Sequence, residues 1–333
     1  MAIRHEFNRG GKEEARLAKA RSRRQTGRMP RSLDHLPAGK RDELKFVVDV
    51  LISSFDAERS TRWAEHLKNG QILRIILYGS YARGDWIDDP VGRYFSDYDL
   101  LIVVEDEKHT DVLEFWEIAE RRLLAELSSG EKLRTPVSFI VHSMVDVNDQ
   151  LARGRYFFMD ILNDGIELFT VPNAPAFVNA EPLERATALI EAQRHYEDWI
   201  PSAANRLLIA EFTMSKGLNS ETAFELHQAA EALYNGLLLV ATLYTPKSHN
   251  LIRLRNLADQ VNPGLAEVWP TNTKAERRGF ELLKQAYVKA RYSRRYKVTV
   301  EELTWMRERI ELLQAKVIAL SDARLAALSK SSR

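Results

Sequence analysis

Hydrophobic and polar positions alternate differently in the two halves of the chain, and the first half mixes strands with helices. Three short apolar runs, at 71–78, 98–104 and 136–142, are rich in branched residues and typical of buried strands. Residues 41–69 and 110–128 instead repeat apolar side chains every three or four positions, which predicts amphipathic helices. This succession of helices and strands indicates a mixed α/β domain with a small mixed sheet.

The second half shows the helical period alone. Prolines at positions 172, 175 and 182 indicate a linker over 173–182. Helical patterning then covers the segments 184–200, 203–218, 221–242, 248–260, 274–291 and 300–328. The sequence therefore predicts an α+β (mixed α/β) fold class, with a first domain at 41–172 and an all-α helical bundle at 183–328.

Composition excludes several classes of function. The chain has no cysteine, which rules out disulfides, thiolate metal sites and a cysteine nucleophile. The formal net charge of +1 gives no global attraction to nucleic acid or membrane. No run reaches the roughly 18 apolar residues that cross a bilayer, and no apolar core follows the first charges as in a secretory signal. We expect a cytoplasmic protein that does not associate with a membrane.

Charge is concentrated at the N-terminus. Residues 1–31 contain ten Lys or Arg against three acids, and glycines and prolines interrupt the segment. Residues 1–40 are therefore expected to form a basic, flexible arm. A solvated arm is the simpler interpretation, and contact with RNA or another polyanion is the sharper one.

A candidate phosphate site follows the first predicted strand. Gly79 lets the backbone turn and lets a phosphate approach, and the next N–H groups and the Ser80 hydroxyl can donate to it. Arg83 and Gly84 extend the same feature, because an arginine fork suits a phosphate or a carboxylate partner.

A candidate metal site opens the second predicted strand. Asp97 and Asp99 are two positions apart, so their carboxylates point to the same face of a strand. Two neighbouring carboxylates repel unless a cation lies between them, and Mg²⁺ or Mn²⁺ suits carboxylate, water and phosphate oxygens. If the two strands are neighbours, the phosphate site and the metal site face each other. Nucleotidyl transfer requires this arrangement of a phosphate site beside a metal site.

The stretch LYGSYARGDW…SDYDLLIVV resembles the minimal nucleotidyltransferases of the polymerase-β-like superfamily, over roughly 71–170. Relatives include the kanamycin- and streptomycin-modifying adenylyltransferases. The resemblance implies that Gly79 and Ser80 hold the triphosphate of ATP and that Asp97 and Asp99 bind magnesium as catalytic carboxylates. The superfamily often has a third carboxylate on a later strand, where this chain has Ser138. His142 at the end of that strand is a candidate base, with Glu167 and Asp160 as weaker ones.

The segments from Ala223 and from Ala286 (AYVKARYSRRYK) resemble a HEPN domain, over roughly 183–325. Such helical domains are often fused or paired with minimal nucleotidyltransferases, and they commonly pair with each other, so a homodimer is expected. Many HEPN domains are ribonucleases in which an arginine is followed, after four to six residues, by a histidine. The helical half of this chain contains no such pair. Its candidate acceptor or phosphate contacts are Arg291, Tyr292, Arg295 and His227. For the first three, the alternative is a solvated helix end with packing tyrosines; for His227, it is a buried polar pair with Glu231.

Two functions are consistent with these patterns. The first is a magnesium-dependent nucleotidyltransferase that moves a nucleoside monophosphate, AMP from ATP, to an unidentified acceptor held between the domains. That acceptor could be a small molecule, a protein hydroxyl or an RNA end, and a protein-modifying or defence role follows only by analogy. The second is an RNA-binding or ribonuclease-like HEPN protein whose first domain only binds or senses nucleotide.

Overall fold

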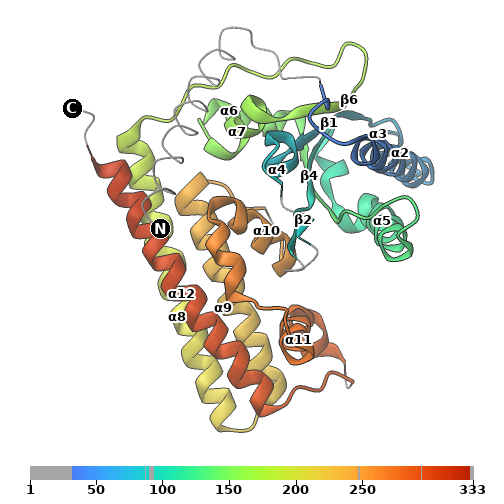
Figure 1. Ribbon diagram of the computed structural model, residues 1–333. Helices are drawn as coiled ribbons and strands as arrows, with labels where there is room; N and C mark the ends of the chain where they lie inside the picture. The colour runs from blue at the N-terminus through green and yellow to red at the C-terminus, as the bar shows by residue number, and fades with distance from the viewer. Residues whose placement is uncertain (1–31, 87, 90–93, 247, 294, 331–333) are drawn as a thin grey trace. The chain divides into compact units, whose positions relative to one another are not determined.

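The computed structural model describes residues 32–86, 88–89, 94–246, 248–293 and 295–330, which fall into two compact units on either side of the Glu181–Pro182 junction (Figure 1). The basic part of the predicted N-terminal arm, at 1–31, lies outside the described residues. In the described part of the chain, no helix is both long and apolar enough to cross a membrane.

The first unit is built on a four-stranded mixed sheet. Its strands are β1 (Ile72–Tyr78), β4 (Tyr98–Val104), β5 (Val137–Ser143) and β6 (Ile166–Thr170), in the order β5-β4-β1-β6. Strand β1 runs antiparallel to both β4 and β6, whereas β4 and β5 are parallel. The three predicted strands are confirmed, and β1 and β4 are neighbours. Strand β6 was not predicted.

Helices α2 (Ala38–Ser60) and α5 (Glu117–Ser129) cover one face of the sheet (Figure 1). Their apolar stripes meet alternate residues of the strands in one core, which includes Val47, Ile75 and Leu100. The predicted helix at 41–69 begins earlier, at Ala38, and is followed by a separate short helix α3 (Glu65–Lys68).

The connections of this unit are short elements. The predicted helix at 110–128 comprises the end of a 3₁₀ turn η1 (Glu107–Thr110), a π-helical turn η2 (Val112–Trp116) and most of α5. Two short strands, β2 (Asp88–Asp89) and β3 (Tyr94–Phe95), come between β1 and β4 along the chain and pair with each other in a separate small sheet.

Helices α6 (Met144–Ala152) and α7 (Tyr156–Asp164) lie on the opposite face (Figure 1). The ring of Phe157 on α7 meets Tyr78 of β1 edge-on, with centroids 5.6 Å apart. On β1, Arg74 pairs with Glu167 of β6, and both side chains are almost buried. The guanidinium also donates to the carbonyl oxygen of Pro175 at 2.8 Å. Glu167 is therefore committed to a structural ion pair.

The second unit is entirely helical in its described residues. It contains α8 (Arg185–Ser215), α9 (Asn219–Thr242), α10 (Leu251–Val261), η3 (Pro263–Val268), α11 (Lys274–Tyr292) and α12 (Val300–Ser329). Helix α9 is its centre, because it packs against α8, α10, α11 and α12. Its apolar and small side chains are buried on nearly every side, as expected for a core helix.

One predicted break in the bundle was wrong. The segments expected as two helices, 184–200 and 203–218, form the single helix α8, with Pro201 inside it. Pro201 is exposed, while Ile200 and Ala203 beside it are buried. Gly236 of α9 faces this stretch, and a Cβ there would lie 2.9 Å from Trp199 Cβ. Close packing of the two helices thus offsets the hydrogen bond that proline removes.

The buried Arg74–Glu167 pair predicts a large stability effect. Replacing Glu167 with Ala leaves an uncompensated buried guanidinium, which is expected to lower the free energy of unfolding by about 3–5 kcal/mol. The measurement is urea denaturation of both proteins at neutral pH. The matched control is Arg121→Ala, whose pair with Glu117 is exposed on both sides, with an expected loss under about 1 kcal/mol. Equal losses in the two variants would contradict a buried pair.

Candidate active site

Gly79 joins the two parts of the candidate site. Strand β1 ends at Tyr78, and the short helix α4 (Gly79–Arg83) begins at once. Gly79 has φ of +73°, and a Cβ on it would lie 2.5 Å from Oδ2 of Asp99. Glycine is therefore required twice, by the backbone conformation and by the carboxylate that occupies the space of a side chain.

Helix α4 presents the rest of the predicted phosphate site. Ser80 lies in its first turn, where N–H groups have no carbonyl partner within the helix. Gly84 ends the helix in the left-handed conformation, with φ of +85°, and its N–H donates to Ser80 O at 2.9 Å. Arg83 lies in the last turn, 3.3 Å from the carboxylate of Asp85. The four predicted nucleotide-binding residues thus share one tight turn of chain.

The two predicted carboxylates lie beside this turn. Asp99 is directly opposite Tyr78 in the β1–β4 pairing and is only 4% exposed, while Asp97 is half-buried just before β4. Burial raises the pKa of Asp99 well above its usual range, the negative charge of Asp97 raises it further, and the positive charge of Arg83 opposes both. This environment disfavours the ionised form of Asp99, and a cation bound beside it would favour that form.

This donor set suits a magnesium ion that arrives with its nucleotide. Two carboxylates and no nitrogen or sulfur favour a hard cation. Among the described residues, no group of three or more His, Cys, Asp or Glu could form a complete protein cage. Magnesium commonly keeps water and takes one or two carboxylates together with substrate phosphates, so Asp97 and Asp99 could hold it together with a nucleotide.

Ser138 occupies the neighbouring position on the next strand. In the parallel pairing of β4 with β5, Ser138 is the partner of Asp99. The place expected for a third carboxylate is therefore adjacent to the pair, and a serine fills it.

His142 lies away from this site. It pairs with Val103 and is about 13 Å further along β5 than Ser138, at the usual rise of a strand. Its Nδ1 is 2.5 Å from a carboxylate oxygen of Asp146, and its ring meets Phe158 edge-on. The structure thus does not bring the candidate base to Asp97 and Asp99.

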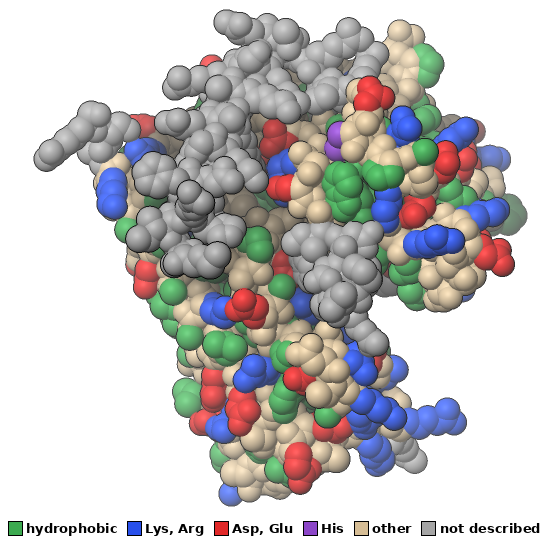
Figure 2. Space-filling view, in the orientation of Figure 1, with side chains coloured by type: hydrophobic (Ala, Val, Ile, Leu, Met, Phe, Trp, Pro, Cys, Tyr) green, Lys and Arg blue, Asp and Glu red, His purple; other side chains and the backbone are tan. Residues whose placement is uncertain are grey.

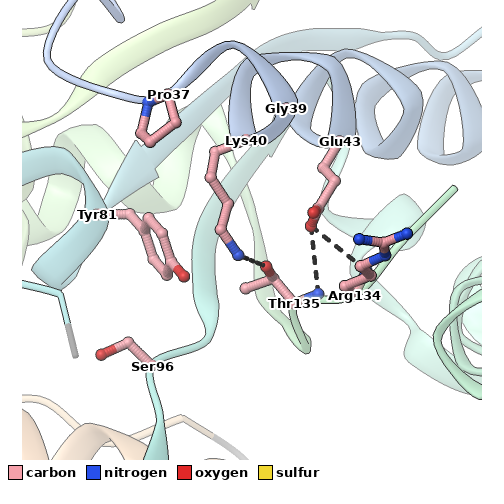
Figure 3. A pocket seen from close by; sticks show the side chains of 8 residues that line it. All are labelled: Pro37, Gly39, Lys40, Glu43, Tyr81, Ser96, Arg134 and Thr135. Atoms are coloured by element: carbon pink, nitrogen blue, oxygen red, sulfur yellow. Dashed lines mark hydrogen bonds between the residues drawn. The ribbon is translucent and has the colours of Figure 1, made fainter. Parts of the chain in front are cut away.

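A pocket on the α2 side of the sheet was not anticipated from the sequence. It measures about 440 Å³ and opens between the start of α2, helix α4 and the chain before β5 (Figure 3). Lys40, which was assigned to the flexible arm, lies near the N-terminus of α2 and donates to the buried Thr135 hydroxyl at 2.6 Å. The glycine, proline and basic residues before position 41 predict a flexible arm, but helix α2 already begins at Ala38.

Arg291 and Tyr292, at the end of α11, belong to an exposed cluster of aromatic and basic side chains. The Arg291 guanidinium lies 4.6–5.0 Å from the ring centroids of Phe224, Tyr287 and Tyr292. Tyr292 is 77% exposed, and Arg295 beyond it is exposed as well. Figure 2 shows Lys and Arg side chains gathered over α11 and the segment after it.

His227 connects this cluster to the core of the helical unit. It is fully buried on α9, its Nδ1 lies 2.9 Å from Leu283 O, and its Nε2 lies 3.5 Å from Glu231. His227 and Glu231 thus form the buried polar pair of the alternative interpretation, and His227 is not exposed to a ligand at the surface. The carboxylate of Glu231 also contacts His249 at 3.0 Å, and the His249 ring stacks on Tyr287 at 4.2 Å. Asn250 caps α10, because its side-chain oxygen accepts from the N–H groups of Ile252 and Arg253.

Comparison with known families agrees with these two units. Residues 61–143 match the family model of the nucleotidyltransferase domain, and residues 196–316 match that of the HEPN domain. Each model covers less than half of the chain. No curated protein matches the chain. The fusion that the sequence suggested, a nucleotidyltransferase domain followed by a HEPN domain, is confirmed.

Gly79 gives a test of the site's geometry. In Gly79→Ala the Cβ collides with Asp99, so we expect the affinity for magnesium–ATP to fall at least about tenfold. The strained backbone should also lower the free energy of unfolding by about 1–3 kcal/mol. Equilibrium dialysis and denaturation measure the two effects. Gly130→Ala is the matched control, because Gly130 has φ of +68° and nothing within 4 Å of its Cβ position. Loss of binding in both variants, or in neither, would contradict the collision.

Glu231 gives a pH-dependent test in the helical unit. Burial raises its pKa, but hydrogen bonds and positive charges of His227 and His249 outweigh burial and lower the pKa below the ordinary value of 4.5. A lowered folded-state pKa contributes stability above pH 4.5 that is lost as the pH falls through the folded-state value. Glu231→Gln should therefore cost about 1–3 kcal/mol at pH 6 and much less at pH 3. A difference independent of pH, in thermal unfolding of both proteins, would refute an ionised Glu231.

Proposed function

From a chain in which a nucleotidyltransferase domain precedes a HEPN domain, we propose that the first unit is a magnesium-dependent nucleotidyltransferase. It moves a nucleoside monophosphate, AMP from ATP, to an acceptor hydroxyl. The contact between Gly79 and Asp99 is the observation that carries this proposal. It places a turn suited to phosphate against a buried carboxylate whose negative charge a cation would stabilise.

Each residue of the site has a role in this proposal. The N–H groups of the Gly79–Ser80 turn and the Ser80 hydroxyl bind triphosphate oxygens, and Arg83 adds positive charge. Asp97 and Asp99 would hold magnesium, which would neutralise the charge of the phosphates and of the leaving pyrophosphate. Because both carboxylates come from one stretch of chain, the pairing of β4 with β1 sets their position relative to the phosphate turn.

The proposed reaction is an in-line displacement at the α-phosphorus. The acceptor oxygen forms a bond to this phosphorus, the bond from the phosphorus to the oxygen that bridges to the β-phosphate breaks, and pyrophosphate leaves. The acceptor proton passes to water, since Ser138 stands where a third carboxylate would otherwise accept it. The chain's own contribution is to align the acceptor and the phosphates in a fixed geometry.

A second candidate function rests on the same serine and on the helical unit. Without a third acid, the first domain could bind nucleotide and not transfer it, while the chain acts on RNA. The exposed side chains of Arg291, Tyr292 and Arg295 favour this alternative, because guanidinium groups and aromatic rings bind single-stranded nucleic acid.

ATP labelled in its α-phosphate separates the two candidates. With magnesium and a cell extract, we expect label on an acceptor, reduced about 100-fold or more in Asp97→Asn/Asp99→Asn, because the metal supplies several kcal/mol of charge stabilisation. The control Asp149→Asn removes an exposed aspartate paired with Arg153 and should keep full transfer. Transfer that survives the double change refutes the proposal. Absence of transfer together with RNA cleavage supports the second candidate.

A further inference from the structure

Tyr98 lies between the two candidate carboxylates along the chain and points to the other face of the sheet. Side chains alternate in a strand, so Tyr98 of β4 faces α2, whereas Asp99 faces the side covered by α6 and α7. The side chain of Tyr98 is fully buried in the core beneath α2. Any contact that holds Tyr98 therefore also holds the piece of backbone that carries Asp97 and Asp99.

The ring of Tyr98 packs against the ring of Tyr81. Their centroids are 4.5 Å apart, and their planes are inclined by 57°. Tyr81 belongs to α4 and directly follows Ser80, so the short helix that carries the phosphate turn meets β4 a second time. The first contact is that of Gly79 with Asp99, and the two contacts lie on opposite faces of β4.

Tyr81 is held in place by three further groups. Its ring stacks on Trp86, with centroids 5.4 Å apart and planes inclined by 10°. The Lys40 ammonium lies 5.7 Å from the ring centroid (Figure 3), and His35 Nε2 is 2.7 Å from the backbone carbonyl oxygen of Tyr81. Because Tyr81 is only 2% exposed, its ring is a packed surface for Tyr98 and not a mobile side chain.

Tyr98 is also tied to two other elements. Its N–H donates to the carbonyl oxygen of Pro136 at 2.8 Å, which joins it to the chain before β5. Its hydroxyl lies 3.3 Å from the carbonyl oxygen of Lys40 and 3.4 Å from Oε2 of Glu43, both on α2. The same oxygen of Glu43 accepts from the backbone N–H of Thr135 at 3.2 Å. Through Tyr98, β4 is therefore fixed to α2, to α4 and to the start of β5.

The direction of α4 depends on a second contact because the helix starts at a glycine. Gly79 allows a wide range of backbone angles, so the pairing of Tyr78 with Asp99 fixes where α4 begins but not where it points. Tyr81 is two residues further along, and its contact with Tyr98 fixes that direction. The N–H groups of the turn and the two carboxylates are then held in one geometry before a ligand binds.

We propose that Tyr98 is a positioning residue for the metal–nucleotide site. Its ring, packed on Tyr81, keeps the phosphate turn and the two carboxylates at the spacing that one magnesium–nucleotide complex spans. This role rests on the proposed nucleotidyl transfer, which requires magnesium and a nucleotide to bind together. Without the ring contact, the turn and the carboxylates would both remain, but binding would first have to order them, at a cost in affinity.

The magnesium dependence of ATP binding tests this role apart from any effect on folding. Equilibrium dialysis gives the dissociation constant of ATP with EDTA and with magnesium, and the ratio of the two measures how far the metal strengthens binding. We expect this ratio to fall at least about tenfold in Tyr98→Leu, because the turn and the carboxylates no longer hold one ligand in a fixed geometry. Tyr98→Phe keeps the ring and should retain the ratio.

Tyr81→Leu removes the same contact from the other side, and it also serves as the test if Tyr98→Leu does not fold. Its ratio should fall as in Tyr98→Leu, and the double variant should lose no more than either single one, because both remove one interaction. Val104→Ala is the matched control, since Val104 is fully buried on the same face of β4, about 20 Å from Tyr98 at the usual rise of a strand. It should lower the thermal unfolding midpoint and leave the ratio unchanged.

The outcomes separate this role from the proposed reaction. An unchanged ratio in Tyr98→Leu and Tyr81→Leu, additive losses in the double variant, or an equal fall in Val104→Ala would overturn the role and leave nucleotidyl transfer standing. A protein whose magnesium–ATP binding depends on Tyr98 but that transfers no label would refute the reaction and leave the positioning role standing. ATP binding that does not respond to magnesium in the unaltered protein would refute both.

Discussion

The pairing of β1 with β4 is the constraint on which the candidate site depends. It sets Tyr78 opposite Asp99, and the missing Cβ of Gly79 then gives the carboxylate the space in which it lies. Two segments separated by a loop become one site through backbone hydrogen bonds. Burial in this pairing and the nearby charge of Asp97 raise the pKa of Asp99, and a cation bound there would lower the cost of its negative charge.

Much of the sheet could be predicted from the sequence because its central strands are apolar throughout. β1 and β4 are buried on both faces, so their runs of branched residues identify them without knowledge of their neighbours. β6 could not be found in this way. It has five residues, and its Glu167 is stabilised by Arg74, which is 93 positions earlier in the chain. No local pattern contains that contact.

The residues of the candidate site also differ in whether local sequence or a distant contact sets their position. Gly79, Ser80, Asp97 and Asp99 carry a spacing that predicts their chemistry. The place of His142 depends instead on the register of β5 against β4, which puts Ser138 beside Asp99 and the histidine further along the strand. The position of Lys40 in a folded helix could not be predicted for another reason, because a basic segment with glycine and proline resembles a flexible tail. In the helical unit, Pro201 suggested a break that packing against α9 overrides.

Helix α2 has a consequence for where the first domain begins. The nucleotidyltransferase family model matches from residue 61, but Val47, Leu51 and Phe55 of α2 are fully or almost fully buried in the core of the sheet. Without them, an apolar sheet face would be open to water, a surface that favours aggregation. The unit that folds is therefore longer than the region that defines the family. The segment before the family's boundary supplies one of the two helices that cover this face of the sheet and part of the wall of the pocket.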